Sequence, residues 1–271
     1  MSTENAGALG APIPFLRSLA IQARVIRALL LREVITRFGR QNLGVLWLIA
    51  EPMLFTMGVA SLWTMAGMKG HSQLPIVAFA ITGYSSVLMW RNTVGRCNRA
   101  IRENASLMFH RNVRVLDVFA ARALLEIAGA TGSFVLLTLG CVALEYAAPP
   151  QDLLLVVGGW LMLGWFGCAL AFLIGSATAY SEIVDRIWHP MSYLLFPLSG
   201  AAFMVDWLPP AARETVLLLP MVHGVELLRE GFFGDVVRTH HDMGYMALVN
   251  LSLTLAGLVL MRGAARRVEE A

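Results

Sequence analysis

The sequence predicts an all-α polytopic membrane protein, and three observations carry this prediction. Of its 271 residues, 57% are hydrophobic and only 14% are charged, a composition that would be exceptional for a soluble domain. Six apolar stretches are each long enough for a helix to cross the hydrocarbon core of a bilayer. Basic residues gather on one side of these stretches, as the positive-inside rule describes.

The first predicted element is an amphipathic helix over residues 12–40. Apolar residues recur there at three- and four-residue spacing, while arginines occupy the other faces: Leu19, Ala23, Ile26, Leu30 and Val34. A helix of this kind lies in the plane of the membrane interface. The alternative is a peripheral anchor that only binds acidic lipid.

Six transmembrane spans are predicted after this helix: 43–68, 74–90, 120–144, 153–181, 187–205 and 243–261. The first span contains Glu51 and Pro52, and an acid inside a membrane is a functional hypothesis by default. We favour a structural ion pair or a helix kink over a proton relay, with Arg91 and Arg122 as available partners. The fourth span carries small residues at every fourth position, which predict a helix packing seam, with an oligomer contact as the alternative: Gly167, Ala171, Gly175 and Ala179.

Residues 204–242 are predicted to form short re-entrant or interfacial helices on the periplasmic side, before the last span. Pro209, Pro210 and Pro220 interrupt this segment, and its apolar stretches are too short to cross a bilayer. A solvent-exposed loop would not need the run of leucines at 217–219. Pro190 and Pro197 predict a kink in the fifth span.

The distribution of basic residues predicts that both termini are cytoplasmic. The predicted outer side holds only Lys69, Arg213, Arg229 and Arg238 of the 21 basic residues, and six acids dilute them. The N-terminus also lacks the basic-then-apolar layout of an export signal.

Two enzymatic or metal-binding alternatives are weak. Ser199 and His223 faintly resemble the serine–histidine dyad of an intramembrane hydrolase, but Pro197 stands where such a serine motif has glycine. The run from His240 to Asp242 could bind a metal, but adjacent histidines in a loop point in different directions. The three cysteines follow no metal or redox spacing.

The sequence contains no site for ATP of the P-loop type. A P-loop needs Gly-Lys-Ser/Thr, but Lys69, the only lysine, has no glycine directly before it and no serine or threonine after it. If ATP drives this protein, another chain must bind the nucleotide.

A predicted cytoplasmic segment after the second span has the character of a protein-docking surface. It mixes apolar side chains with charged ones on one short stretch: Glu103, Asn104, Leu107, Met108, Phe109 and Arg111. A smaller contact is predicted on the same side of the membrane, at Glu182, Asp185 and Arg186.

These residues resemble the ABC type-2 permeases, and within them the capsule polysaccharide export permeases of the KpsM type. The similar segments occur in order along nearly the whole chain: residues 31–33, 36–39, 43–44, 46–47, Glu51-Pro52, 121–126, 220–223, 225–227 and 229–230. The Glu-Pro pair favours the capsule branch, since O-antigen relatives more often carry Asn-Pro there. The resemblance implies one ABC type-2 transmembrane domain over residues 1–271.

The resemblance also implies partners and a substrate. The chain would form a homodimer in the bacterial inner membrane, with two copies of a separate ATPase that binds ATP and Mg²⁺, so that this chain itself has no cofactor and is not an enzyme. A periplasmic co-polymerase and an outer-membrane export protein would complete the assembly. The substrate would be a lipid-linked anionic polysaccharide rather than a nucleic acid, with O-antigen, teichoic acid or a small lipophile as alternatives.

Family position assigns roles to particular residues. The stretch from Glu103 to Arg111 would be the coupling helix that contacts the ATPase, framed by the N-terminal amphipathic helix. The cytoplasmic substrate path would include arginines that suit an anionic head group, together with aromatic and acidic neighbours: Arg32, Arg37, Arg40, Trp47, Glu51, Trp90 and Arg91.

Overall fold

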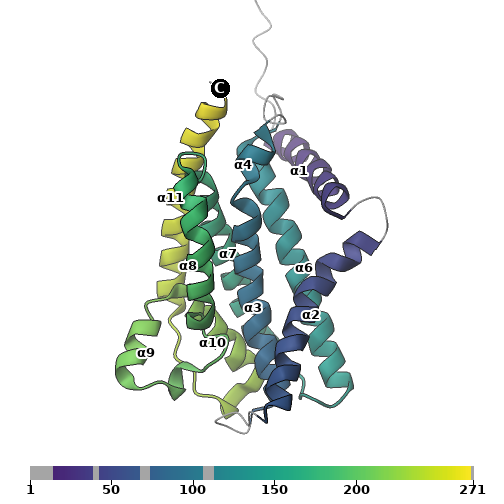
Figure 1. Cartoon of the computed structure of the whole chain (residues 1–271), viewed down its shortest axis with the longest axis vertical. Helices are drawn as coiled ribbons and strands as arrows, with labels where there is room; N and C mark the ends of the chain where they lie inside the picture. The colour runs from purple at the N-terminus through teal and green to yellow at the C-terminus, as the bar shows by residue number, and fades with distance from the viewer. Residues whose placement is uncertain (1–14, 39–42, 68–73, 106–112, 270–271) are drawn as a thin grey trace, which may run out of the picture.

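The protein is a bundle of long helices crossed at one end by a further helix (Figure 1). The computed structural model describes residues 15–38, 43–67, 74–105 and 113–269. Every regular element within these ranges is a helix, and none is a strand. The predicted all-α class is therefore confirmed.

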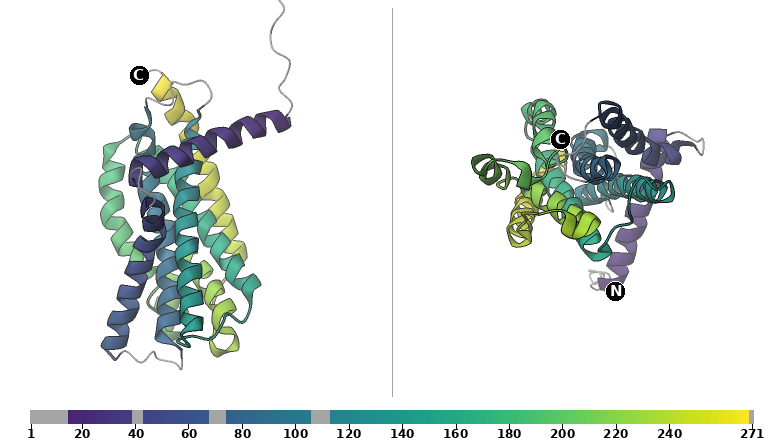
Figure 2. Two further views of the ribbon diagram at one scale, coloured as in Figure 1. Left: turned by 90° about the vertical axis from the view of Figure 1, so that its right-hand side faces the viewer. Right: turned by 90° about the horizontal axis from the view of Figure 1, so that it is seen from below.

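Helix α1 (Phe15–Phe38) lies across the end of the bundle, nearly perpendicular to the long helices (Figure 2). It packs against α6 (Val115–Ala143) and α2 (Leu43–Met65), in the orientation predicted for an interface helix. Ile26, Leu30 and Val34 are half-buried there, whereas Leu19 and Ala23 are exposed. The apolar face of α1 is therefore more buried towards its C-terminal half.

The long axis of the bundle is formed by α2, α3 (Ile76–Cys97), α6, α7 (Leu153–Ala177), α8 (Glu182–Leu198) and α11 (Met243–Glu269) (Figure 1). Among the described residues, four of these are long and apolar enough to cross a membrane, namely α2, α6, α7 and α11. Helix α3 carries two arginines, and α8 has 17 residues with a charged first turn. Six spans therefore remain a prediction.

Helix α8 begins and ends earlier in the sequence than the predicted span at 187–205, because local interactions fix both of its ends. The Ser181 hydroxyl accepts a hydrogen bond from the amide of Ile183, and two acids in the first turn complement the helix dipole. Gly200, with φ of +83°, lies just beyond the C-terminus. Helix α3 likewise continues to Cys97, past the predicted end at residue 90.

Helix α7 lies at the centre of the bundle, between α3, α10 and α11. A Cβ added at Gly167 would lie 3.0 Å from the Cα of Trp90, and one at Gly175 would lie 2.7 Å from the carbonyl oxygen of Cys97. Both glycines thus allow α7 and α3 to approach closely. The predicted seam is confirmed as packing within one chain.

The segment predicted to hold short helices contains η1 (Val205–Trp207), α9 (Pro210–Val216), α10 (Pro220–Phe233) and η2 (Gly234–Val236). Helix α10 is almost fully buried and packs on α7. Its Arg229 is fully buried and donates hydrogen bonds of 2.6–2.7 Å to the carbonyls of Gly200, Ala201 and Phe203. The same guanidinium lies 3.8 Å from the ring centroid of Phe79, so this one side chain fastens the chain after α8 to α3 and α10.

Candidate functional site

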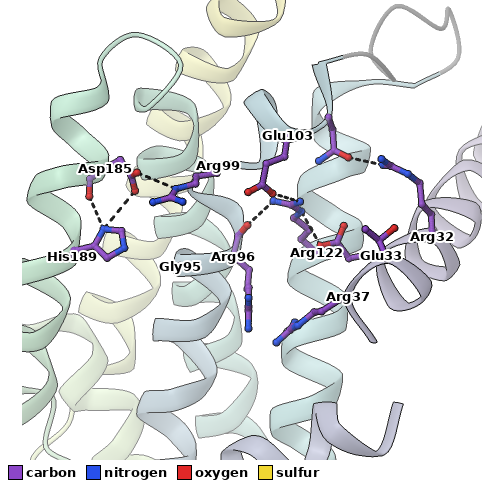
Figure 3. Close-up of a pocket in the computed structure, with 12 residues that line it drawn as sticks. Arg32, Glu33, Arg37, Gly95, Arg96, Arg99, Glu103, Arg122, Asp185 and His189 are labelled. Atoms are coloured by element: carbon purple, nitrogen blue, oxygen red, sulfur yellow. Dashed lines mark hydrogen bonds and ion pairs between the residues drawn. The ribbon is translucent and has the colours of Figure 1, made fainter. Parts of the chain in front are cut away.

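A charged pocket of about 550 Å³ lies where α1 crosses the bundle, at the end that we call the arginine-rich end (Figure 3). Helices α1, α3, α6 and α8 and the short helix α4 (Ala100–Glu103) line it. Its walls are Arg32, Glu33, Thr36, Arg37, Gly95, Arg96, Arg99, Glu103, Asn104, Arg122, Asp185 and His189. The pocket thus brings residues predicted for the substrate path together with residues predicted for ATPase coupling.

Arg122 of α6 is the central side chain of this pocket (Figure 3). Its Nη1 donates to the carbonyl of Arg96 at 2.9 Å, and its Nη2 donates to Glu103 at 2.6 Å. Its Nε lies 3.2 Å from a carboxylate oxygen of Glu33. Because its side chain is only 9% exposed, this single guanidinium joins α1, α3 and α4 to α6.

A second group of ion pairs joins α1 and α6 one helical turn further along both helices. Arg37 of α1 donates to Glu126 of α6, and its Nη2 is 3.6 Å from Glu51 of α2. Arg96 of α3 also approaches Glu126, at 3.6 Å. The expected ion pair of Glu51 therefore exists, but Arg91 and Arg122 were the wrong partners. Glu51 lies within a helix that is long and apolar enough to cross a membrane, and its side chain is 47% exposed in the single chain.

Asn104 connects α1 to the start of the predicted coupling segment. It accepts a hydrogen bond from Arg32 at 2.7 Å, and its side-chain amide donates to the carbonyl of Ala100 at 2.9 Å. The remaining predicted coupling residues lie outside the described residues, as does one residue of the predicted substrate path: Leu107, Met108, Phe109, Arg111 and Arg40.

The second predicted docking segment, at the start of α8, lies beside the first. Asp185 accepts hydrogen bonds from Asn98 and, at 3.1 Å, from Arg99. Glu182 accepts one from Arg102 at 2.9 Å, and Arg186 approaches the same carboxylate at 3.8 Å. The structure thus places Glu103 and Asn104, the described start of the first segment, and the second segment at the arginine-rich end, and joins them through the C-terminal end of α3 and α4.

The other predicted path residues occupy different surroundings. Trp47 on α2 is exposed, whereas Trp90 is fully buried with its ring 5.7 Å from that of Phe166. Trp90 is therefore a core side chain in this structure and lines no pocket described here. Arg91 lies over the ring of Tyr193, with 4.5 Å between its Cζ and the ring centroid.

Sequence reasoning assigned no site role to four residues that line the pocket around Arg32 and Arg37, or to Glu126, which pairs with Arg37 beside it. The four lining residues are Glu33, Arg96, Arg99 and Arg122. Arg96 and Arg99 were used only to assign topology, and Arg122 was considered only as a partner of Glu51. A usable signal is present, because α1 carries Glu33 and Arg37 while α6 carries Arg122 and Glu126, each pair four residues apart. Side chains at this spacing share one helix face, and the two pairs match crosswise when the helices cross.

The structure gives other roles to the residues of the hydrolase and metal alternatives. Ser199 donates to the carbonyl of Phe196 at 2.6 Å. His223 bonds the carbonyl of Leu217 through Nε2 and the amide of Asp242 through Nδ1, both at 2.8 Å. Backbone groups therefore occupy both ring nitrogens, and no hydrogen bond joins His223 to Ser199.

The two adjacent histidines point to different carboxylates. His240 lies 3.2 Å from Asp206, and His241 lies 2.8 Å from Glu230. Within the described ranges, no three His, Cys, Asp or Glu side chains converge as metal ligands.

Comparison with known proteins gives a consistent result. The sequence profile described as "ABC-2 type transporter" matches residues 24–233. The chain is 44% identical to the capsule polysaccharide export inner-membrane protein CtrC of Neisseria meningitidis serogroup B, over 94% of this chain and 96% of the relative. It is 41% identical to the protein BexB of Haemophilus influenzae, which has the same description, over the same shares. The polysialic acid transport protein KpsM of Escherichia coli is 28% identical, over 89% of this chain and 94% of the relative.

Proposed function

Because the chain belongs to the ABC-2 type transporter family, we propose that it is the permease subunit of an ATP-driven exporter of capsular polysaccharide in the bacterial inner membrane. The observation that carries the proposal is the 44% identity, across 94% of the chain, to a capsule polysaccharide export inner-membrane protein. The long apolar helices and the charged pocket at one end of the bundle are what such a subunit requires.

The cargo that we propose is a lipid-linked anionic polysaccharide, moved from cytoplasm to periplasm. Among the described residues, five arginines line the pocket at the arginine-rich end, against three acids. A surplus of positive charge at a pocket attracts an anionic substrate. The positive-inside rule places this end in the cytoplasm, where such a substrate would enter. The relative from Escherichia coli is named for transport of an acidic polymer, which supports this substrate class.

Family membership implies an ABC ATPase partner, and we propose where it docks. Glu103 to Arg111 and the first turn of α8 form the contact, with ATP and Mg²⁺ bound by the partner chain. When the ATPase moves this contact, the ion pairs of Arg122 with Glu103 and Glu33 transmit the movement to α6 and α1. Substitutions Leu107→Glu and Met108→Glu are expected to leave ATP hydrolysis in the purified complex but abolish export. Normal export with these variants would contradict the docking site.

The full assembly that we propose is a homodimer with two ATPase copies, linked to a periplasmic co-polymerase. Large apolar side chains on the outer faces of α2 and α8 are exposed in a single chain, among them Leu54, Phe55, Ile187 and Leu194. These faces meet either lipid or a second copy. The mass of the purified complex, measured by light scattering with detergent subtracted, tests the stoichiometry.

A deletion strain tests the proposed export function. Loss of the gene is expected to remove capsule from the cell surface and leave the polymer in the cytoplasm, and the wild-type gene is expected to restore export. Intact surface capsule in the deletion strain would refute the proposal. Retention of O-antigen or teichoic acid, rather than capsule, would select one of the alternative cargoes.

A further inference from the structure

We propose that a groove between α3 and α8 binds the carboxylate of an acidic sugar residue. The groove has a volume of about 440 Å³ and lies beside the charged pocket, with which it shares Arg96. Arg91 and Asn92 of α3 form one wall, and Trp188 and Tyr193 of α8 form the other. The proposal rests on the export function above, because it names the feature of the exported polymer that the permease recognises.

Arg91 is held in place by aromatic rings instead of by a carboxylate. Its Cζ lies 4.5 Å from the ring centroid of Tyr193 and 5.7 Å from that of Phe196. Within the part of the chain that the structure describes, its side chain makes no hydrogen bond or ion pair. Stacking uses the flat face of the guanidinium and leaves the N–H groups along its edge for a planar anion.

The charge of the groove is not neutralised from within. None of the described residues that line it is acidic, and two of them are arginines. Arg96 reaches Glu126 only at 3.6 Å. Asp185, at the nearby first turn of α8, is engaged by Asn98 and Arg99. The groove therefore favours an anion, and both of its arginines come from α3.

The remaining side chains fit a sugar. The ring of Tyr193 is 65% exposed and offers an apolar surface for the face of a sugar ring. The amide of Asn92 carries donors and an acceptor for hydroxyl groups and has no side-chain hydrogen bond within the described residues. A carboxylate matches the paired N–H groups of one guanidinium edge. A phospholipid phosphate is another oxyanion with similar chemistry, so the experiment must separate the two.

Binding is measured on the full chain with its ATPase in phosphatidylcholine nanodiscs. The probe is fluorescent oligosialic acid, and a neutral dextran oligosaccharide of matched length is the control ligand. Arg91→Gln is expected to weaken oligosialic acid binding roughly 10- to 100-fold, the effect of losing a charge-assisted hydrogen-bonded pair. Arg91→Lys keeps the charge without the planar edge, so its affinity should lie between the two. Arg24→Gln is the matched control, because Arg24 is exposed on α1 and its side chain bonds, among the described residues, only the carbonyl of Ala20.

Tyr193→Leu provides a second variant at an exposed position, where misfolding is not expected. It releases Arg91 from its ring and is expected to weaken binding several-fold. Co-elution of each variant with the ATPase confirms assembly. Equal binding by wild type, Arg91→Gln and Tyr193→Leu would overturn the proposal, as would dextran binding as tightly as oligosialic acid.

A lipid arm and a cellular arm complete the test. If phosphatidylglycerol in the nanodiscs displaces oligosialic acid in wild type but has no such effect in Arg91→Gln, the groove is a lipid site and the proposal fails. If Arg91 has no effect on binding while capsule export still requires the chain, the groove assignment fails and the export function stands.

Discussion

Substitution of Arg122 by Gln tests the proposed coupling network at its centre. The variant removes the 2.6 Å hydrogen bond to Glu103 and the 3.2 Å ion pair with Glu33. A hydrogen bond to a charged group contributes about 1.5–3 kcal/mol when buried. Glu103 is 51% exposed, so its bond to Arg122 contributes about 1 kcal/mol or less. Glu33 is 21% exposed, so its ion pair with Arg122 retains most of the energy of a buried pair. We therefore expect a loss of about 2–3 kcal/mol in the free energy of unfolding.

Unfolding in mixed micelles, titrated with sodium dodecyl sulfate, measures this loss. Arg102→Gln is the matched control, because Arg102 is 45% exposed and pairs with the 64% exposed Glu182, so its loss should stay below about 1 kcal/mol. A double-mutant cycle of Arg122→Gln with Glu33→Gln should give a coupling energy above about 0.5 kcal/mol. Arg122→Gln should also retain ATP hydrolysis with reduced export. An unfolding free energy equal to that of Arg102→Gln, together with normal export, would refute the reasoning.

Two further predictions concern packing and pH at other parts of the bundle. Gly159→Ala is expected to lower the free energy of unfolding by about 1–3 kcal/mol, because its Cβ would lie 2.8 Å from the amide nitrogen of Leu228. Gly158→Ala should change it by less than about 1 kcal/mol, since its Cβ would meet only a side-chain carbon at 3.8 Å; equal effects in the same micelle titration would contradict the close packing of α7 and α10. Burial lowers the pKa of His223 below its usual 6.5, so its neutral form is favoured in the folded state. Stability from this group is complete above pH 6.5 and is lost as pH falls through the lowered pKa, because a proton on Nδ1 removes the bond from the amide of Asp242. Hydrogen exchange at that amide should accelerate on acidification, and a rate independent of pH after correction for intrinsic exchange would contradict this role.

The long helices could be predicted because their apolar runs are strong local signals. The ends of α8 could not, since Glu182 and Asp185 read as a loop between two spans. In the fold these acids form the first turn of a helix that Ser181 caps. Helix α3 was cut short for a similar reason, because Arg91 and Arg96 interrupt its apolar character while its backbone continues to Cys97. Charged residues are compatible with the end of a helix in a membrane protein when their side chains face groups of opposite charge.

The site could be predicted only in part. Site roles for Arg32, Arg37 and Asp185 were predicted from their side of the membrane and from family position. The structure brings these three residues into one pocket. The roles of Arg122 and Glu33 depend on how α1 crosses α6, and no local pattern fixes that angle. Arg229 was counted among basic residues on the outer side. Its burial against three carbonyls is visible only once the chain after α8 folds back.

ATP-dependent movement of the polymer across a membrane tests the central claim most directly. Inside-out vesicles are prepared from the deletion strain carrying the wild-type chain and its ATPase, and labelled lipid-linked capsular polymer is supplied on the outside. The account predicts that the polymer becomes protected from an added capsule-degrading enzyme when ATP is present, and that Arg122→Gln reduces this protection while ATP is still hydrolysed. Polymer that stays fully digestible in wild-type vesicles with ATP would contradict it.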